Sequence, residues 1–479
     1  MEIKNDTPNN AESIENYTLY ESAEKNLPSA DFISEIISNK SHAQLREIVE
    51  NLPPLDLAEL MNSLSKEIRF AFYRLLPKNL AAEVFVELDA DLAEELVSAF
   101  SDGELQQVLA ELYIDDTVDI IEEMPANVVK RILKNSSPEN RSTINELLRY
   151  PKNSAGTIMT TEYVKLKPTM TVLEALTHIR AVAIDKETVY NCYVTDSNRR
   201  LIGVASAKRL LISPLETLVS DIMEESVIFA KTSEDREEVA GKIEKYGFIA
   251  LPVVDNECRL VGIVTVDDAM NVLREEAEED FAKMAAIIPG ETEYLKTSAF
   301  SIFKARIPWL LILMISATFS SAILGFFEAS LIPVLVLFVP MLMDTGGNSG
   351  SQASVTAIRG LSTGEVEMRD VLKILAKEIT VGAMLGLTLG VIAFVKVLVV
   401  DGIVFSNSAV TLTVAIAVSI SLALTVICAK IIGSTLPFLA KRLGVDPAVM
   451  ASPFITTLVD IVGLMMYFAV SAYAFGLTI

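Results

Sequence analysis

The stretch VPMLMDTGGNSGSQASVTAIRG, residues 339–360, decides how the second half of the chain folds. It lies mostly within an apolar segment, Leu331 to Ile358, which is long enough for the roughly 20 residues that cross a hydrocarbon core. Asp344, Asn348 and Gln352 fall in its middle, at a depth where lipid cannot satisfy polar groups. These side chains must face protein or water. The stretch therefore predicts a membrane-embedded helix bundle with a polar path through it.

The glycines of this stretch allow two interpretations. The adjacent pair Gly346 and Gly347 predicts a helix that unwinds and points carbonyl oxygens into a cavity, where they suit a hard cation or its water shell. Alternatively, Gly346 and Gly350 only allow two helices to pack closely. Packing alone does not explain Asp344 and Asn348. We therefore favour an ion path that includes Gly346, Gly347 and Asn348.

Basic residues orient the predicted membrane segments. Arg306 precedes the first segment, Arg369 follows the second and Lys441 follows the fourth. Because Lys and Arg accumulate on the cytoplasmic side, the N-terminus is expected inside and the C-terminus outside. The chain is thus predicted to be a multi-pass protein of the cytoplasmic (inner or cell) membrane, in contact with the lipid bilayer through five spans: Ile307–Phe327, Leu331–Ile358, Ile379–Val400, Val410–Ile432 and Pro453–Phe475.

The last span carries one ionisable group, Asp460. A carboxylate inside a membrane is costly enough to indicate a functional site, although a protonated Asp bonded to a neighbouring helix is the plainer alternative. Ser452, Thr456 and Asp460 are spaced by four residues and so lie on one helical face. In a symmetric dimer, two such faces could form an oxygen-lined pore.

The net charge belongs entirely to the first part of the chain. The 11 basic and 11 acidic residues after position 290 cancel, so the net charge of −23 lies in residues 1–290. Such a surface excludes nucleic acid as a partner and favours divalent cations. Only His42 and His178 are histidines, so no His-based dyad or HExxH motif supports an enzyme.

Two further regions precede a tandem repeat. Residues 1–30 are polar and are expected to form a disordered tail, and residues 31–150 show short amphipathic runs opened by proline or acidic caps, which predict an acidic α-superhelical domain. Asp115, Asp116 and Asp119 recur along one side of a predicted helix there. A solvated face is the default explanation for them.

The repeat covers residues 151–213 and 214–267, each with a β-α-β-β-α pattern. CYVTDSNRRLIGVASAKRLL, from residue 192, is echoed by LPVVDNECRLVGIVTVDDAM, from residue 251. Both stretches resemble tandem CBS modules of α+β fold. Thr265 and Asp268 match the Thr-x-x-Asp that holds an adenosine ribose in such modules, whereas the first module has Ser206 and Arg209 at these places. ATP is therefore left open as a ligand of the CBS modules.

Residues 268–290 are expected to form a connecting helix that closes with Pro289-Gly290. One face carries an apolar stripe and the other a run of acids that includes Glu276, Glu279 and Asp280. Like charges at these spacings destabilise an isolated helix. The segment is therefore expected to lie beside a cation or a basic partner.

In this order, the motifs DTGGNSGSQ, IRGLSTGEV and DPAVMASPFITTLVD resemble the MgtE family of magnesium channels and transporters, which are related to the SLC41 carriers. The resemblance covers nearly the whole chain and implies an all-α five-helix pore domain at residues 291–479. It also implies a homodimer with Asp460 as the main ion-selecting residue, and Ser452 stands where family members often have Asn. Beside the N-domain candidates Asp115, Asp116 and Asp119, it implies cytoplasmic magnesium-sensing acids at Asp235, Glu237, Asp268, Glu276, Glu279 and Asp280.

The resemblance implies Mg²⁺ import that cytoplasmic Mg²⁺ shuts off by drawing acidic surfaces together. Two alternatives stay open. Oxygen ligands discriminate weakly among divalent metals, so Co²⁺, Mn²⁺ or Ni²⁺ could also pass. A CBS-regulated carrier of another, organic or anionic, solute would instead need a basic residue or helix N-termini at mid-membrane, where this sequence has acids and amides.

Overall fold

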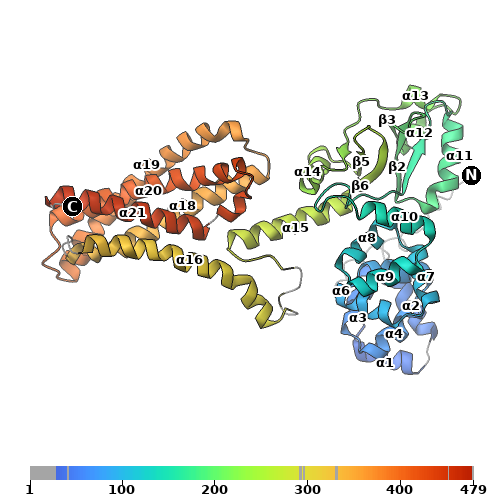
Figure 1. Ribbon diagram of the computed structural model, residues 1–479, viewed down its shortest axis with the longest axis horizontal. Helices are drawn as coiled ribbons and strands as arrows, with labels where there is room; N and C mark the ends of the chain where they lie inside the picture. Colours follow the sequence, from blue (N-terminus) through green and yellow to red (C-terminus); the bar gives the residue numbers. More distant parts are fainter. Residues whose placement is uncertain are drawn as a thin grey trace, which may run out of the picture. The chain divides into compact units, whose positions relative to one another are not determined.

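The computed structural model describes residues 28–39, 42–290, 294, 297–328, 333–450 and 452–476 (Figure 1). Its chain divides into two compact units that meet between Leu273 and Arg274. Residues 1–27, which include most of the expected disordered tail, lie outside the described residues, as do Lys296 and Leu331. Each unit is described on its own below.

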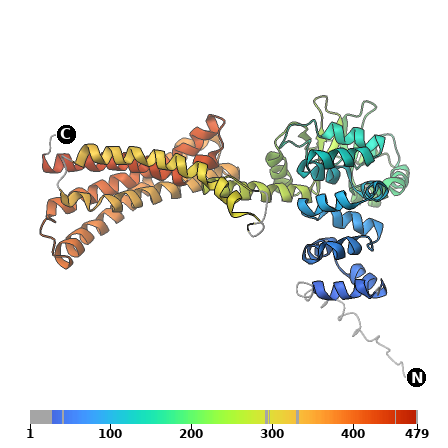
Figure 2. The same cartoon turned by 60° about the horizontal axis from the view of Figure 1, so that its bottom comes forward.

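The first unit begins with ten short helices whose ends are set by local capping. Ser101 and Glu104 form a reciprocal capping box at the start of α7, and Pro54 and Pro138 occupy first-turn positions of α3 and α10. Figure 2 shows these helices stacked on one another. The predicted superhelix of short helices is confirmed, with these bounds: α1 Ala30–Ser38, α2 His42–Asn51, α3 Pro54–Ser63, α4 Lys66–Tyr73, α5 Lys78–Val86, α6 Ala90–Ala99, α7 Asp102–Glu111, α8 Ile114–Glu123, α9 Ala126–Asn135 and α10 Pro138–Leu147.

The successive helices bury one apolar stripe each and are joined by arginines. Leu57, Phe72, Leu96 and Ile132 are fully buried in one continuous core. Arg131 donates to the carbonyl oxygens at the end of α6, where helix termini leave acceptors unpaired. Short helices that are marginal alone thus gain stability from packing and from these bridges.

The repeat forms two matching α+β modules, as predicted. Each has a three-stranded sheet in which the first two strands are parallel and the last two antiparallel. The Thr160 N–H donates to the Ile263 carbonyl, and Tyr163 and Tyr193 pack with Leu260, so the modules share a core. The elements are β1 Tyr163–Leu166, α11 Val172–Val182, a short 3-10 turn Ala183–Asp185, β2 Thr188–Thr195, β3 Leu201–Ser206, α12 Ala207–Ile212, α13 Val219–Ile222, β4 Ala230–Lys231, α14 Arg236–Tyr246, β5 Ala250–Val254 and β6 Leu260–Thr265.

The connecting helix is shorter than expected. α15 spans Val266–Met284 and so ends six residues before Gly290. Ala286 adopts a left-handed backbone conformation, with φ of 55°, and the Ile287 N–H returns to the Ala282 carbonyl. This is the reversal that commonly closes a helix, here without the usual glycine. The chain therefore turns before Pro289 can act as a stop.

The second unit contains the apolar helices. They are α16 Ala299–Glu328, α17 Pro333–Val336, α18 Val339–Ser362, α19 Val371–Lys396, α20 Leu412–Arg442 and α21 Ser452–Phe475, with 3-10 turns at Met368–Asp370 and Pro447–Met450. A π-helical segment, Val397–Val404, extends α19. Among the described residues, α16, α19, α20 and α21 have the length and hydropathy to cross a membrane, and α18 has the length but carries the polar stretch. The predicted helical C-terminal domain is confirmed.

Candidate ion pathway and acidic clusters

The glycines of α18 bring three helices together. A Cβ added at Gly346 would lie 2.7 Å from Cγ2 of Thr425 on α20, and one at Gly350 would lie 2.9 Å from Cγ2 of Ile455 on α21. Only glycine allows such approach. α18 is helical throughout from Val339 to Ser362, so the expectation that Gly346 and Gly347 unwind the helix and present carbonyls is wrong. The packing interpretation of the glycines is the one that the structure supports.

Polar groups lie along the same two helices. Gly347 packs against Thr456, where a Cβ would come within 3.0 Å of Thr456 Cγ2, and Asp460 follows one turn later on α21. Asn348 Nδ2 donates to Asp344 Oδ1 at 3.3 Å on α18. Asp344 and Asp460 are close enough to interact electrostatically. The glycine contacts therefore place two carboxylates from different helices near each other.

Asp344 and Asp460 have no ion-pair partner among the described residues, unlike several other acids of the second unit. In the part of the chain that the structure describes, ion pairs of this unit engage other carboxylates, among them Glu378 with Lys430 at 3.8 Å and Asp401 with Lys396 at 2.8 Å. No ion pair with Asp344 or Asp460 is found among those residues. Like charges in a low-dielectric environment repel. These two charges are therefore not neutralised by an ion pair within the described part of the chain.

The hydroxyls predicted for this face contribute less than expected. Thr456 Oγ1 donates to the Pro453 carbonyl at 2.9 Å, so its proton is used within α21 and only its lone pairs remain. Ser452 begins α21, but its side chain lies outside the described residues. Asp344 and Asn348 are exposed in the single chain.

A second acidic cluster lies within the first unit. Burial and the charges of Asp116 and Asp268 raise the pKa of Asp115 to about 9, and burial and the charge of Asp268 raise that of Asp116 to about 6. Asp119, on the same helix, is exposed. α8 thus presents Asp115 and Asp116 to the start of α15, whereas Asp119 agrees with the default explanation of a solvated face.

Acids of the first CBS module belong to this cluster as well. Burial, followed by the charges of Asp267 and Asp116, raises the pKa of Glu187 to about 7. Glu162 adds to the field at Asp115 and accepts a hydrogen bond from Thr160 Oγ1 at 2.7 Å. Across the described residues, no three acidic, His or Cys side chains stand close enough to hold a metal ion as they are. A cation would have to draw these carboxylates inward.

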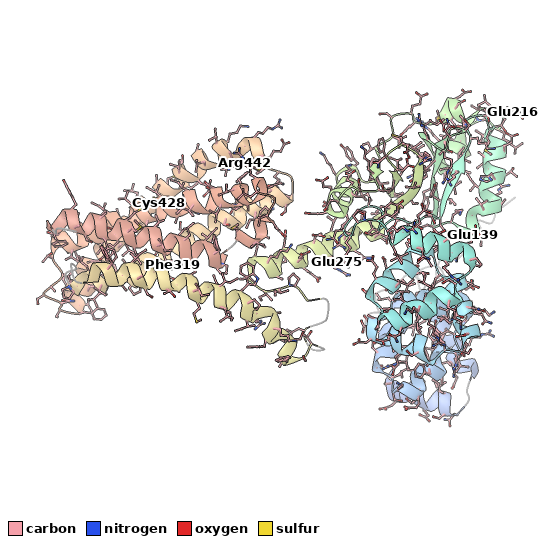
Figure 3. The ribbon with its side chains drawn as sticks, viewed as in Figure 1. Glu139, Glu216, Glu275, Phe319, Cys428 and Arg442 are labelled. Carbon is pink, nitrogen blue, oxygen red and sulfur yellow. The ribbon has the colours of Figure 1, made fainter. Side chains whose placement is uncertain are left out.

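The other predicted acids lie elsewhere. Asp235 caps α14, accepting the Glu237 N–H at 2.9 Å, and both side chains are exposed. On α15, Glu279 pairs with Lys283 at 2.6 Å, and Asp280 accepts a hydrogen bond from Ser362 at 3.3 Å. Figure 3 shows the side chains along this helix, with Glu275 labelled. The predicted sensing acids therefore do not form one site but occupy α8, α14 and both ends of α15, with Glu276 in the middle of α15.

The candidate nucleotide residues bond to each other. Thr265 Oγ1 donates to Asp268 Oδ2 at the start of α15. In the first module, Arg209 takes the place of the acid, donates to the Ile222 carbonyl at 2.8 Å and lies 3.5 Å from Glu224. Only the second module therefore offers the Thr and Asp pair to a ribose.

Comparison with known proteins follows the same division of the chain. The MgtE family, described as divalent cation transporters, matches residues 339–470, the MgtE intracellular N domain matches 52–153, and the CBS domain matches 155–215 and 219–275. A protein named magnesium transporter MgtE from Thermus thermophilus is 40% identical over 445 residues, which cover 92% of this chain and 97% of the relative. The chain belongs to the MgtE family.

Other members are more distant. A magnesium transporter MgtE from Bacillus subtilis is 35% identical over 68% of this chain and 70% of its own length. A crystal structure of the cytosolic domain of the Mg²⁺ channel MgtE in complex with ATP is 38% identical, covers 51% of this chain and 99% of its own, and has a TM-score of 0.48. The MgtE family consists of transporters, in agreement with the expectation that the chain is not an enzyme.

MgtE membership and the apolar helices make this a multi-pass membrane protein. Sequence reasoning missed several residues that the structure brings to the sites. Thr425 lies between α18 and α21, and its buried hydroxyl has no hydrogen-bond partner among the described residues. A lone hydroxyl in an apolar helix gave no signal. A sequence signal did exist for Asp446, which stands in the quoted DPAVMASPFITTLVD motif. No such signal existed for Glu187.

Proposed function

We propose that the chain imports Mg²⁺ across the cytoplasmic membrane, with the path lined by α18 and α21 and Asp460 as the ion-selecting carboxylate. The observation that carries the proposal is the approach of Asp344 and Asp460 with no ion-pair partner among the described residues. Mg²⁺ keeps its water shell tightly, so carboxylate and amide oxygens can hold the hydrated ion without removing that shell. The relatives named magnesium transporters support this choice of ion.

The exposure of α18 supports a homodimer. Asp344 and Asn348 are exposed in the single chain, yet they lie in the middle of a helix of membrane-spanning length. Polar groups at that depth face protein or water and not lipid. A second copy placed against the same face would enclose them, with the pore on the two-fold axis. The basic residues Arg306, Arg369 and Lys441 support an orientation with the N-terminus in the cytoplasm and the C-terminus outside.

Cytoplasmic Mg²⁺ would shut the path through the acids of the first unit and α15. Burial, together with the charge of Asp268, raises the pKa of Asp115 and Asp116, so in the absence of a cation their charged forms are desolvated and repelled by Asp268. A divalent ion would neutralise this repulsion and bring α8 and the start of α15 together. Mg²⁺ can shift the equilibrium toward the closed form only by the difference between its binding free energies to the two forms. ATP at Thr265 and Asp268 would compete with this use of Asp268.

The test is Mg²⁺ uptake into proteoliposomes by the wild type, Asp460→Asn and the matched control Glu365→Gln, an exposed acid between α18 and α19. The isosteric Asp460→Asn variant should lose uptake by at least about tenfold, because it removes the charge and keeps the shape. Equal uptake by Asp460→Asn and Glu365→Gln would refute the assignment. Adding Co²⁺, Mn²⁺ or Ni²⁺ as competitors measures how broad the selectivity is.

A further inference from the structure

The end of α15, which belongs to the second unit, is joined to the connection between α20 and α21 by a lysine. Lys283 Nζ lies 2.6 Å from Glu279 Oε1 on the same helix and 2.5 Å from Asp446 Oδ2, in the connection between α20 and α21. Its side chain is 23% exposed, against 35% for Glu279 and 36% for Asp446. The ammonium is therefore partly shielded from water and bridges two carboxylates 167 positions apart in number.

The surrounding contacts fix the two partners. Asp446 Oδ1 accepts the Ala448 N–H at 2.8 Å, which orients the carboxylate toward α15. Met284, the residue after Lys283, packs with Ile358 and Ala448. The last turn of α15 thus rests on the end of α18 and on the 3-10 turn before α21.

The charge at this contact needs a cation. Asp280 accepts a hydrogen bond from Ser362, and burial, followed by the charge of Asp446, raises its pKa. Glu279, Asp280 and Asp446 bring three carboxylates to one place, and Lys283 is the basic residue that the structure pairs with them. Without it, like charges would oppose the contact. The Lys283 ammonium contacts the carboxylates of both Glu279 and Asp446.

We propose that Lys283 is a positioning residue, a tethered cation that holds the end of α15 against the connection between α20 and α21 without any metal and competes with Mg²⁺ for Glu279 and Asp446. The role in closure rests on the proposed function, whereas the metal-free contact does not. Lys283 would thereby set the Mg²⁺ concentration at which the ion binds to Glu279 and Asp446. Glu279 and Asp446 would bind Mg²⁺ only after the ammonium has left.

The test is disulfide formation between Met284→Cys and Ala448→Cys in the full-length chain in lipid nanodiscs, with Cys192, Cys258 and Cys428 changed to Ser. Met284 and Ala448 pack in the same cluster, so the rate of disulfide formation reports the contact. In EDTA, Lys283→Gln should slow disulfide formation roughly tenfold. This effect lies between the costs of breaking an exposed and a buried ion pair. Lys283→Arg and the exposed control Lys441→Gln should keep the original rate.

The exchange of charges, Lys283→Glu with Asp446→Lys, should restore the rate of disulfide formation in EDTA. A restored rate would show that variants at these two positions still fold. Addition of Mg²⁺ should restore the rate of disulfide formation in Lys283→Gln. The Mg²⁺ concentration that does so should be lower than the concentration at which the rate in the parent chain changes. An unchanged rate for Lys283→Gln in EDTA, or no recovery with Mg²⁺, would overturn the proposal. Failure of the wild type to take up Mg²⁺ would refute the proposed function alone, because the rates in EDTA do not depend on transport.

Discussion

Gly433 marks the closest contact between α20 and α18. A Cβ added there would fall well within contact distance of the Gly350 carbonyl oxygen, 2.9 Å from the Gly350 carbonyl carbon and 3.1 Å from its Cα. These are backbone atoms, so no side-chain rotation can relieve the overlap. Gly433→Ala must therefore push the two helices apart, and α18 carries Asp344 on the proposed path.

The expected cost has two opposing parts. Inserting a methyl group into a packed contact costs about 1–3 kcal/mol, and a backbone overlap belongs at the upper end. Replacing a helical glycine by alanine returns about 1 kcal/mol. The matched control is Gly325→Ala on α16, where a Cβ meets nothing within 4 Å and only the helix propensity changes. The two variants should thus differ by roughly 3 kcal/mol in the free energy of unfolding.

The assay is thermal unfolding of the full chain in detergent, followed by circular dichroism, together with Mg²⁺ uptake into proteoliposomes. Gly433→Ala should melt below the wild type and take up less Mg²⁺, while Gly325→Ala should melt at or above the wild-type temperature with unchanged uptake. If the two variants melted at the same temperature, the close contact between α18 and α20 would not exist in the membrane-extracted protein.

Two further predictions concern charged groups. The folded state raises the pKa of Asp115 from 3.8 to about 9, so its protonated form favours folding and this stabilisation is lost as pH rises between these values. Hydrogen exchange of α8 in EDTA, corrected for intrinsic rates, should therefore become faster from pH 6 to pH 9, and Asp115→Asn should flatten this pH dependence. The same slope in Asp115→Asn would contradict the prediction. Lys396→Gln should leave the Asp401 carboxylate unpaired, which should lower the free energy of unfolding by about 1–3 kcal/mol and so lower the melting temperature. Adding Asp401→Asn should recover most of this loss. No recovery in the double variant would show that the ion pair is not the cause.

The sequence predicted the fold of the first unit well because its signals are local. Caps such as Ser101 with Glu104 set helix starts within three residues, and the repeated strand pattern identifies the two CBS modules. The end of α15 was misplaced for a physical reason. A non-glycine residue, Ala286, takes the left-handed conformation that usually indicates glycine, so the reversal left no trace in the sequence.

The membrane unit shows where sequence reasoning stops. Two glycines in a helix are equally compatible with unwinding and with close packing, and only the neighbouring atoms, such as Thr425 beside Gly346, decide between them. The spacing of Lys396 and Asp401 is a second case. Five residues apart, they would lie on different sides of an α-helix, and the wider π-helical turn brings them together. Such a segment cannot be read from composition.

Pairing sorts the acids of the second unit by role. Glu378, Asp401 and Asp446 each have a lysine partner, so their charges are neutralised within the chain. Asp344 and Asp460 have none among the described residues, although both lie in helices of membrane-spanning length. On the proposed path, a cation from solution would balance their charge. An anionic solute would add to the repulsion, which argues against a carrier of anions and for a cation path between α18 and α21.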